Sequence, residues 1–196
     1  HQYALLSKDN LYGFISRLSG SKKVMAPFSK GHNNYSFEEV RSGETIALNY
    51  IPTTLPPKKF FMPQYETLLS YKIGKTINVE TVVEYEEMVL FGVHTCDLAG
   101  IQCLNMVFSE RPKDYNYLTR KPHILIIGLE CNNYCDEHAS CNLVNASLPS
   151  GGYDLFFTDL GDYFMVHVNT QEGEEMVEAT RSFEPAGKDQ LHELAD

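Results

Sequence analysis

Three uninterrupted apolar runs constrain the fold of this chain more than any other feature of its sequence. They are Met88–Val93, Ile124–Leu129 and Leu155–Phe157, and all are rich in β-branched or aromatic residues. A strand with one face in water alternates apolar and polar residues, whereas a strand covered on both faces is apolar throughout. The runs therefore predict an α/β fold, with a mainly parallel sheet flanked by helices.

The segments around these runs supply the expected helices. Residues 97–108 have a helical pattern and separate the first two runs, so the three segments together predict a β-α-β unit. Residues 8–18 place their apolar side chains on one helical face. We expect a further helix over 62–71, with Leu68 and Leu69 facing inward.

The remaining strands are expected at the margins of the sheet. Lys23–Pro27 fits an edge strand or the end of a strand, because Pro27 has no N–H to donate to a neighbour. Residues 30–58 contain many turn-forming residues and are expected to be irregular. Tyr163–Val168 should pair with the third apolar run through the turn at Gly161–Asp162, which gives a short antiparallel C-terminal hairpin.

The last part of the chain differs in character from the rest. Residues 172–196 are polar with a helical pattern, which is interrupted at Pro185–Gly187. We therefore expect an α/β domain over residues 1–171, followed by a helical linker over 172–196.

Charge and hydropathy exclude two classes of partner. The formal net charge is −10, with 26 acidic and 16 basic residues. Nucleic-acid binding needs clustered Lys and Arg, and none are clustered here. No run approaches the ~20 apolar residues of a membrane span, and the first residues do not resemble a secretion signal. We expect a soluble, cytoplasmic protein.

Cysteine is the residue type that points to chemistry. The chain has five cysteines, an odd number that in a cytoplasmic protein indicates metal ligands or reactive thiols rather than disulfides. A chain of 196 residues can bury a sufficient core without a metal, so any metal would serve a function.

Four of the cysteines are expected at one edge of the sheet. Cys96 follows the first apolar run at the start of a helix, whose N-terminus should lower the pKa of this thiol, and Cys131 follows the second run. Cys135 and Cys141 lie in the polar loop beyond. The four thiolates could surround a [4Fe–4S] cluster or a tetrahedral zinc ion, although the C-x3-C-x5-C spacing matches neither a ferredoxin nor a zinc ribbon.

Other interpretations of these residues remain open. Cys103 lies seven positions after Cys96, about 10.5 Å along a helix, and is expected in the core rather than at the same metal. His94 and His138 are expected to be polar neighbours, or else bases for a Cys96–His94 or Cys141–His138 nucleophile, which would leave the other cysteines unexplained. A buried cysteine can also act as a small hydrophobic residue.

Several motifs in order along most of the chain resemble one family, the beta subunits of sulfhydrogenases together with the A subunits of anaerobic sulfite reductases. The segments that carry the resemblance are Pro57–Gln64 with Glu66, Phe91–Ala99, Asp114–Tyr115 with Tyr117, Ile127–Cys131, and Gly152–Leu155 with Thr158–Leu160.

The resemblance implies the N-terminal domain of an iron–sulfur electron-transfer subunit. Such a subunit relays electrons between a flavin-containing, diaphorase-like partner that uses NAD(P)H and a catalytic hydrogenase or sulfite reductase subunit. Cys96 and Cys131 match family cysteines, and Cys141 matches the first member of a C-x-C pair whose second position is Leu143 here. Cys135 is the candidate for the missing ligand. The family usually continues into a ferredoxin-like domain. A zinc-stabilised or metal-free docking module is the alternative.

Overall fold

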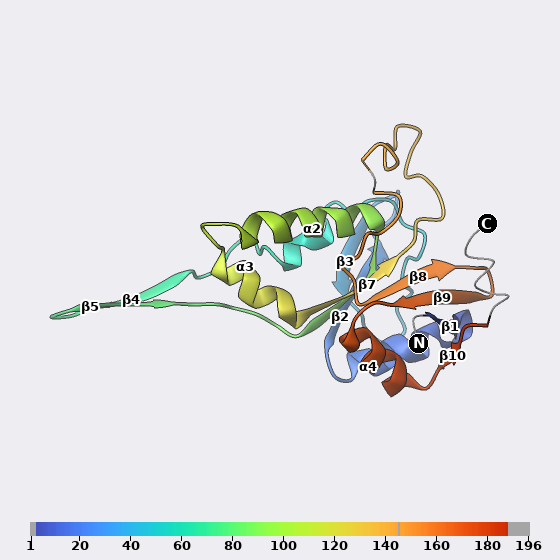
Figure 1. Ribbon diagram of the computed structural model, residues 1–196, viewed down its shortest axis with the longest axis horizontal. Helices are drawn as coiled ribbons and strands as arrows, with labels where there is room; N and C mark the ends of the chain where they lie inside the picture. The colour runs from blue at the N-terminus through green and yellow to red at the C-terminus, as the bar shows by residue number, and fades with distance from the viewer. Residues whose placement is uncertain (1–2, 145, 188–196) are drawn as a thin grey trace.

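The computed structural model describes residues 3–144 and 146–187. Over these residues the chain forms an eight-stranded sheet with helices on both faces, and a two-stranded arm that projects away from it (Figure 1). The sheet strands are β1 Tyr3–Ser7, β2 Lys23–Ser29, β3 Tyr35–Glu39, β6 Met88–Val93, β7 Ile124–Leu129, β8 Leu155–Asp159, β9 Tyr163–Val168 and β10 Phe183–Pro185, and the arm strands are β4 Leu69–Ile73 and β5 Ile77–Thr81. The helices are α1 Leu11–Ser19, α2 Thr95–Ser109, α3 Tyr115–Arg120 and α4 Gln171–Thr180, with short 3-10 turns at Lys8–Asn10, Pro57–Phe60 and Lys121–His123.

The centre of the sheet is parallel and its margins are antiparallel. The strand order is β10-β1-β9-β8-β7-β6-β2-β3. The pairs β2–β6, β6–β7 and β7–β8 are parallel, while β9, β1, β10 and β3 join as antiparallel strands. The predicted α/β fold is confirmed, as are the three apolar strands and the C-terminal hairpin of β8 and β9.

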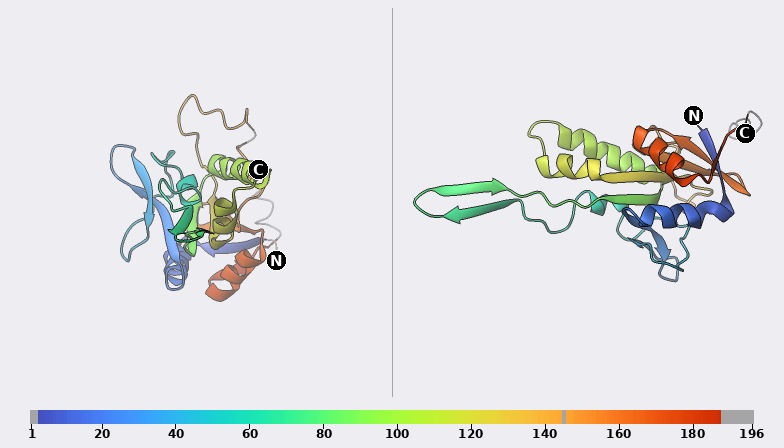
Figure 2. Two further views of the ribbon diagram at one scale, coloured as in Figure 1. Left: turned by 90° about the vertical axis from the view of Figure 1, so that its left-hand side faces the viewer. Right: turned by 90° about the horizontal axis from the view of Figure 1, so that it is seen from below.

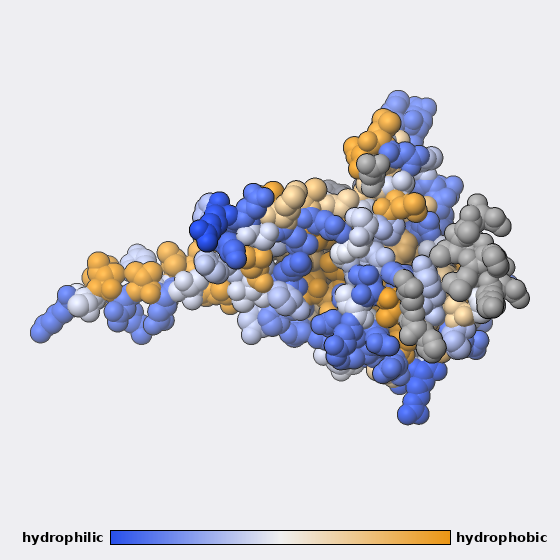
Figure 3. Space-filling model, in the orientation of Figure 1, coloured by the Kyte–Doolittle hydropathy of each residue, from blue (hydrophilic) through white to orange (hydrophobic). Residues whose placement is uncertain are grey.

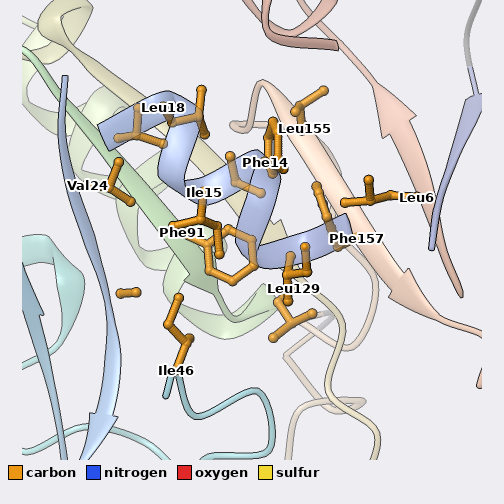
Figure 4. Close-up of a cluster of buried hydrophobic side chains, with 14 of the residues drawn as sticks. Leu6, Phe14, Ile15, Leu18, Val24, Ile46, Phe91, Leu129, Leu155 and Phe157 are labelled. Carbon is orange, nitrogen blue, oxygen red and sulfur yellow. The ribbon is translucent and has the colours of Figure 1, made fainter. Parts of the chain in front are cut away.

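The continuous apolar runs arise because each central strand contributes side chains to two hydrophobic cores, one on each face of the sheet. Along β6, Val89 and Phe91 face the core under α1 and α4, whereas Met88 and Leu90 face the core under α2 and α3. Figure 4 shows the first of these cores, where Phe14 of α1 lies over Phe157 of β8. Burial on both faces removes the selection for polar residues that a solvent-exposed face would impose.

The helix expected over 62–71 is wrong. Leu69–Ile73 is strand β4, paired with β5 in the projecting arm, and Leu68 and Leu69 are exposed rather than inward-facing. The segment has a strand's periodicity, because Leu69, Tyr71 and Ile73 recur at every second position. One apolar face of an extended hairpin was mistaken for the buried face of a helix.

Residues 23–27 were expected to form an edge strand or the end of a strand. The edge position is wrong, because β2 lies between β6 and β3, and the strand continues past Pro27 to Ser29. Pro27 is tolerated since the pairing of β2 with β6 ends at Met25. Residues 30–58, expected to be irregular, contain β3, which pairs with β2 and places Phe37 opposite Pro27.

The segment after residue 171 begins with α4, whose Met176 joins the core beneath the sheet. β10 then pairs with β1 at the sheet margin. The described part of the expected linker, residues 172–187, thus packs on the α/β domain, while residues 188–196 lie outside the described residues. A further domain remains a prediction. In the part of the chain that the structure describes, no helix has the length and apolarity to cross a membrane.

Candidate metal centre

Two adjacent parallel strands end at the same edge of the sheet and carry cysteines beyond it. β6 ends at Val93 and α2 begins at Thr95, so Cys96 lies in the first turn of this helix. β7, which is paired with β6, ends at Leu129 and leads directly to Cys131. The carboxyl ends of parallel strands are where α/β folds place their functional groups, and both cysteines follow that rule.

The long connection from β7 to β8 brings two more cysteines to this edge. In Figure 1 this connection rises above the sheet as a yellow-to-orange loop near the start of α2. Cys96, Cys131, Cys135 and Cys141 all line one cavity of about 330 Å³, together with Thr95, Tyr134, Asn142 and other loop residues. All four thiols are free and partly buried. The loop is braced by a hydrogen bond from Asn142 Nδ2 to the Tyr134 hydroxyl (2.7 Å).

Burial raises the pKa of these thiols. Cys96 has its pKa raised to about 12, first by burial and then by the charges of Asp97 and of the other three cysteines. Burial and the neighbouring Cys135 raise the pKa of Cys131 to about 11, and burial also raises the pKa of Cys135. The low thiol pKa expected for Cys96 from the helix N-terminus is therefore wrong, because burial and the charges of neighbouring acidic groups raise the pKa.

One interaction favours the thiolate form. Thr95 donates to Cys131 through both its hydroxyl and its backbone N–H, and this opposes the rise in the pKa of the thiol. Such donors at a helix N-terminus are suited to a negatively charged sulfur.

The donor set fits a thiophilic metal or cluster. Four thiols gathered in one partly buried cavity repel one another when ionised, and a bound cation removes that penalty while it displaces their protons. Over residues 3–144 and 146–187, however, no three His, Cys, Asp or Glu side chains are grouped closely enough to hold a metal ion as they stand. The cysteines share a cavity but do not form a preassembled coordination sphere.

A second cavity, of about 180 Å³, lies beside the first and shares Cys131 and Cys135 with it. Its other walls include Tyr50 and His94, whose rings are stacked at 3.8 Å. Burial lowers the pKa of His94 to about 4, so the imidazole is neutral at pH 7.

Tyr50 is held in place by an irregularity in β6. The pairing of β6 with β7 shifts between Phe91 and Val93, and the intervening Gly92 has a φ of 82°. This conformation favours glycine, and the Pro27 ring leaves little space for a side chain at Gly92. The Gly92 carbonyl accepts a hydrogen bond from the Tyr50 hydroxyl (2.7 Å). The bulge thereby fixes the aromatic ring that covers His94.

The Cys96–His94 pair considered from the sequence does not have the electrostatics of an activated nucleophile. The pKa of Cys96 is raised and that of His94 is lowered, so both are neutral at pH 7, opposite to a thiolate–imidazolium pair. His138 is solvent-exposed and contacts Glu137 at 3.5 Å.

Cys103, expected in the core, is exposed on α2. Leu98 and Ile101 occupy the face of α2 that contacts the sheet, so Cys103 lies outside this buried stripe. Leu143, at the position where the family has a second cysteine of the C-x-C pair, is 85% exposed.

Sequence reasoning missed two residues of the site. Tyr50 lies in a stretch without periodicity and reaches the site only through tertiary packing. Thr95 could have been noticed, because it lies between His94 and Cys96 at a helix start, where hydroxyl side chains commonly satisfy free donors and acceptors.

Comparison with curated proteins finds a relative named Sulfhydrogenase 2 subunit beta from Pyrococcus furiosus, 34% identical over 177 residues. The alignment covers 90% of this chain and 51% of the relative, so the chain spans about half the length of the protein it matches. No family model matches, and no solved structure matches. The similarity confirms the resemblance to sulfhydrogenase beta subunits that the motifs predicted.

Proposed function

Taking this relationship to sulfhydrogenase beta subunits as the premise, we propose that the chain is an iron–sulfur electron-transfer subunit of an oxidoreductase complex. The observation that carries the proposal is the convergence of Cys96, Cys131, Cys135 and Cys141 on a single cavity. Four thiolates are the usual ligand set of a [4Fe–4S] cluster.

Two of the four proposed ligands are held by the sheet, and the other two lie in a loop. Cys96 and Cys131 are attached to the ends of buried strands and are therefore held by the sheet. Cys135 and Cys141 belong to the loop between β7 and β8, which would have to draw in to complete the coordination sphere. In this arrangement Cys135 takes the place of the family cysteine that Leu143 replaces.

When bound, a [4Fe–4S] cluster supplies a centre that accepts and donates one electron reversibly. The protein's own part is to hold and shield it. Thr95 donates to the Cys131 sulfur, which stabilises the ligand in its ionised form. The neutral His94, stacked on Tyr50, lines the neighbouring cavity, which shares Cys131 and Cys135 with the four-cysteine cavity. Hydrogen bonds to sulfur and limited solvent access are the means by which a protein adjusts a cluster's potential.

The proposed partners follow from the family. Electrons would arrive from a flavin-containing, diaphorase-like subunit that oxidises NAD(P)H and would leave to a hydrogenase or sulfite reductase catalytic subunit. The name of the relative supports an assembly of several subunits, since that protein is itself one subunit of a sulfhydrogenase.

Anaerobic purification of the chain, with an absorption spectrum and iron and sulfide analysis, tests the proposal. We expect a brown protein with about four iron atoms and about four sulfides per chain, bleached by a strong reductant. Stoichiometric zinc without iron would overturn the redox role and favour the zinc-stabilised docking module. A chain that binds neither metal after anaerobic reconstitution with iron and sulfide would favour the metal-free docking module.

A further inference from the structure

The arm formed by β4 and β5 has no role in the cysteine site. It extends along the long axis of the molecule, well clear of the eight-stranded sheet, in Figure 1 and in the right-hand view of Figure 2. Every residue of both strands is exposed. An isolated two-stranded hairpin is at best marginally stable in water, so this conformation calls for a partner surface.

The arm is apolar on one face and polar on the other. Tyr71 pairs with Val79 and Ile73 with Ile77, so these four side chains and Leu69 share one face. Figure 3 shows hydrophobic residues in a line along one side of the arm. The five side chains are between 56% and 80% exposed.

The size of this surface suits a protein interface. Five large side chains at this exposure present on the order of 600 Å² of mostly apolar area, against ~800 Å² per partner in a standard stable interface. Monomeric proteins rarely leave contiguous apolar patches of this size uncovered.

Hydrogen bonds and an ion pair at the root of the arm, where the hairpin joins the domain, fix the direction of the arm. Arg120 of α3 is buried and donates to the carbonyl of Phe61 (2.8 Å) before the arm and to that of Glu84 (3.0 Å) after it. The same guanidinium pairs with Glu66. Asn116 adds a hydrogen bond to the carbonyl of Val82 (2.9 Å). A buried cation that joins the segments before and after the hairpin orients the arm as an extension of the domain.

This root accounts for sequence motifs that the cysteine site leaves unexplained. Phe61 and Glu66 belong to the first quoted motif, and Tyr117 to the third. Phe61 and Tyr117 are buried against each other, with ring centroids 6.2 Å apart, and Phe61 is the residue whose carbonyl accepts from Arg120.

We propose that the apolar face of the arm docks into an apolar groove with an acidic rim on a different subunit of the same assembly. Charge supports this choice of partner. The hairpin over residues 69–81 carries Lys72 and Lys75 against one acid, Glu80, although the whole chain has a net charge of −10. Lys72 lies on the polar face beside Asn78 and Lys75 lies in the turn of the hairpin, so carboxylates on the rim, outside the apolar contact, would complement these lysines.

A second copy of the chain is a poorer occupant. If two arms packed their apolar faces together around a two-fold axis, neither arm would offer a carboxylate at the contact, because its one acid, Glu80, lies on the polar face with Lys72. Such a dimer would also bring together two chains that each have a net charge of −10, and these chains would repel each other.

Site-specific crosslinking in the native assembly tests this inference. A photoreactive phenylalanine analogue replaces Tyr71 on the apolar face or, as the matched control, Asn78 on the polar face of the paired strand. We expect the probe at Tyr71 to crosslink in high yield to a peptide of a different subunit, and the probe at Asn78 to react at least several-fold less. Crosslinks to a second copy of this chain, or equal and low yields at both positions, would overturn the inference.

A paired substitution separates docking from folding. Tyr71→Ser with Ile73→Ser removes the apolar contact, whereas Ser70→Ala with Asn78→Ser changes only the polar face. We expect the first variant alone to separate from the assembly during gel filtration, with unchanged thermal unfolding of the isolated chain. Retention of the first variant in the assembly would contradict the inference.

The inference rests on the proposed function only in assuming a multi-subunit assembly. Iron content distinguishes the two possible failures, because the arm variants leave all four cysteines intact. Docking without iron would refute the cluster and keep the arm's role. Iron without a crosslink would do the reverse.

Discussion

Arg120 and Glu66 form an ion pair across the root of the arm, with side chains only 6% and 18% exposed. Arg120→Leu leaves two backbone carbonyls without their donor, and it leaves the carboxylate of Glu66 with only the longer hydrogen bond from Asn116 Nδ2 (3.4 Å). We expect the free energy of unfolding to fall by about 3–5 kcal/mol, as is typical when one partner of a buried pair is removed. Urea denaturation at pH 7 measures this loss.

The control for this substitution is the exposed pair of Lys23 and Glu86 (2.9 Å). Lys23→Met should cost less than about 1 kcal/mol, because solvent screens surface pairs. Equal losses in both variants would mean that the clamp at the arm's root contributes no more than a surface contact.

The cysteine assignment predicts that substitutions of the four proposed ligands lower the iron content, whereas substitution of the fifth cysteine does not. Serine at position 96, 131, 135 or 141 should each lower the iron bound after anaerobic purification to less than half of the wild-type value, since serine is a weak ligand for iron. Cys103→Ser should bind as much iron as the wild type, because Cys103 does not line the cavity. Iron lost through Cys103→Ser and kept in Cys135→Ser would refute the ligand set.

Gly128 of β7 has no room for a side chain. An added Cβ would lie 2.5 Å from Cδ2 of Phe156 and 3.1 Å from Cδ1 of Leu98. Leu98 lies on α2 two residues after Cys96, so Gly128→Ala should displace the start of this helix. We expect a loss of about 1–3 kcal/mol from overpacking, measured by thermal or urea unfolding.

Gly13 is the matched glycine for comparison. It lies within α1, and an added Cβ would meet nothing within 4 Å. Gly13→Ala should stabilise the protein by up to about 1 kcal/mol through helix propensity. A stabilising effect of alanine at Gly128 would show that the helix and sheet tolerate a wider separation there.

Asp154 should make stability depend on pH. Burial raises the pKa of this carboxyl above its ordinary 3.8, although hydrogen bonds from Thr170 and from the backbone of Ile126, both 2.7 Å, oppose the rise. A raised folded-state pKa means that the native protein binds more protons than the unfolded chain in the window above 3.8. The contribution of Asp154 is therefore greatest below that pH and declines as the pH rises through the folded-state value.

Asp154→Asn abolishes this titration. The wild-type free energy of unfolding minus that of the variant should fall as the pH rises above 3.8 and then become constant. Urea denaturation of both proteins in parallel at a series of pH values measures the difference. A difference that grows with pH would mean that the hydrogen bonds outweigh the burial.

The central strands could be predicted from sequence because burial on both faces leaves a local signature, an uninterrupted apolar run. The places of Cys96 and Cys131 followed from the same runs, since parallel strands bring their carboxyl ends to one edge. The arm was misassigned for the opposite reason. Its every-second-residue apolar pattern was read as a helix face, and its root is held by Arg120, which lies about fifty residues away from Glu66 in the sequence, a contact that no local pattern reports.

The rest of the site was decided by tertiary structure. The sequence by itself determined which thiols could reach the sheet edge, through strand ends and loop length. It did not determine their protonation, because the pKa of Cys96 depends on burial and on charges contributed by Asp97 and by a loop 35 to 45 residues away. The stacking of Tyr50 on His94 and the exposure of Cys103 could not be determined from the sequence either. Desolvation and ring stacking depend on what the remainder of the chain brings alongside, and only the folded chain supplies that.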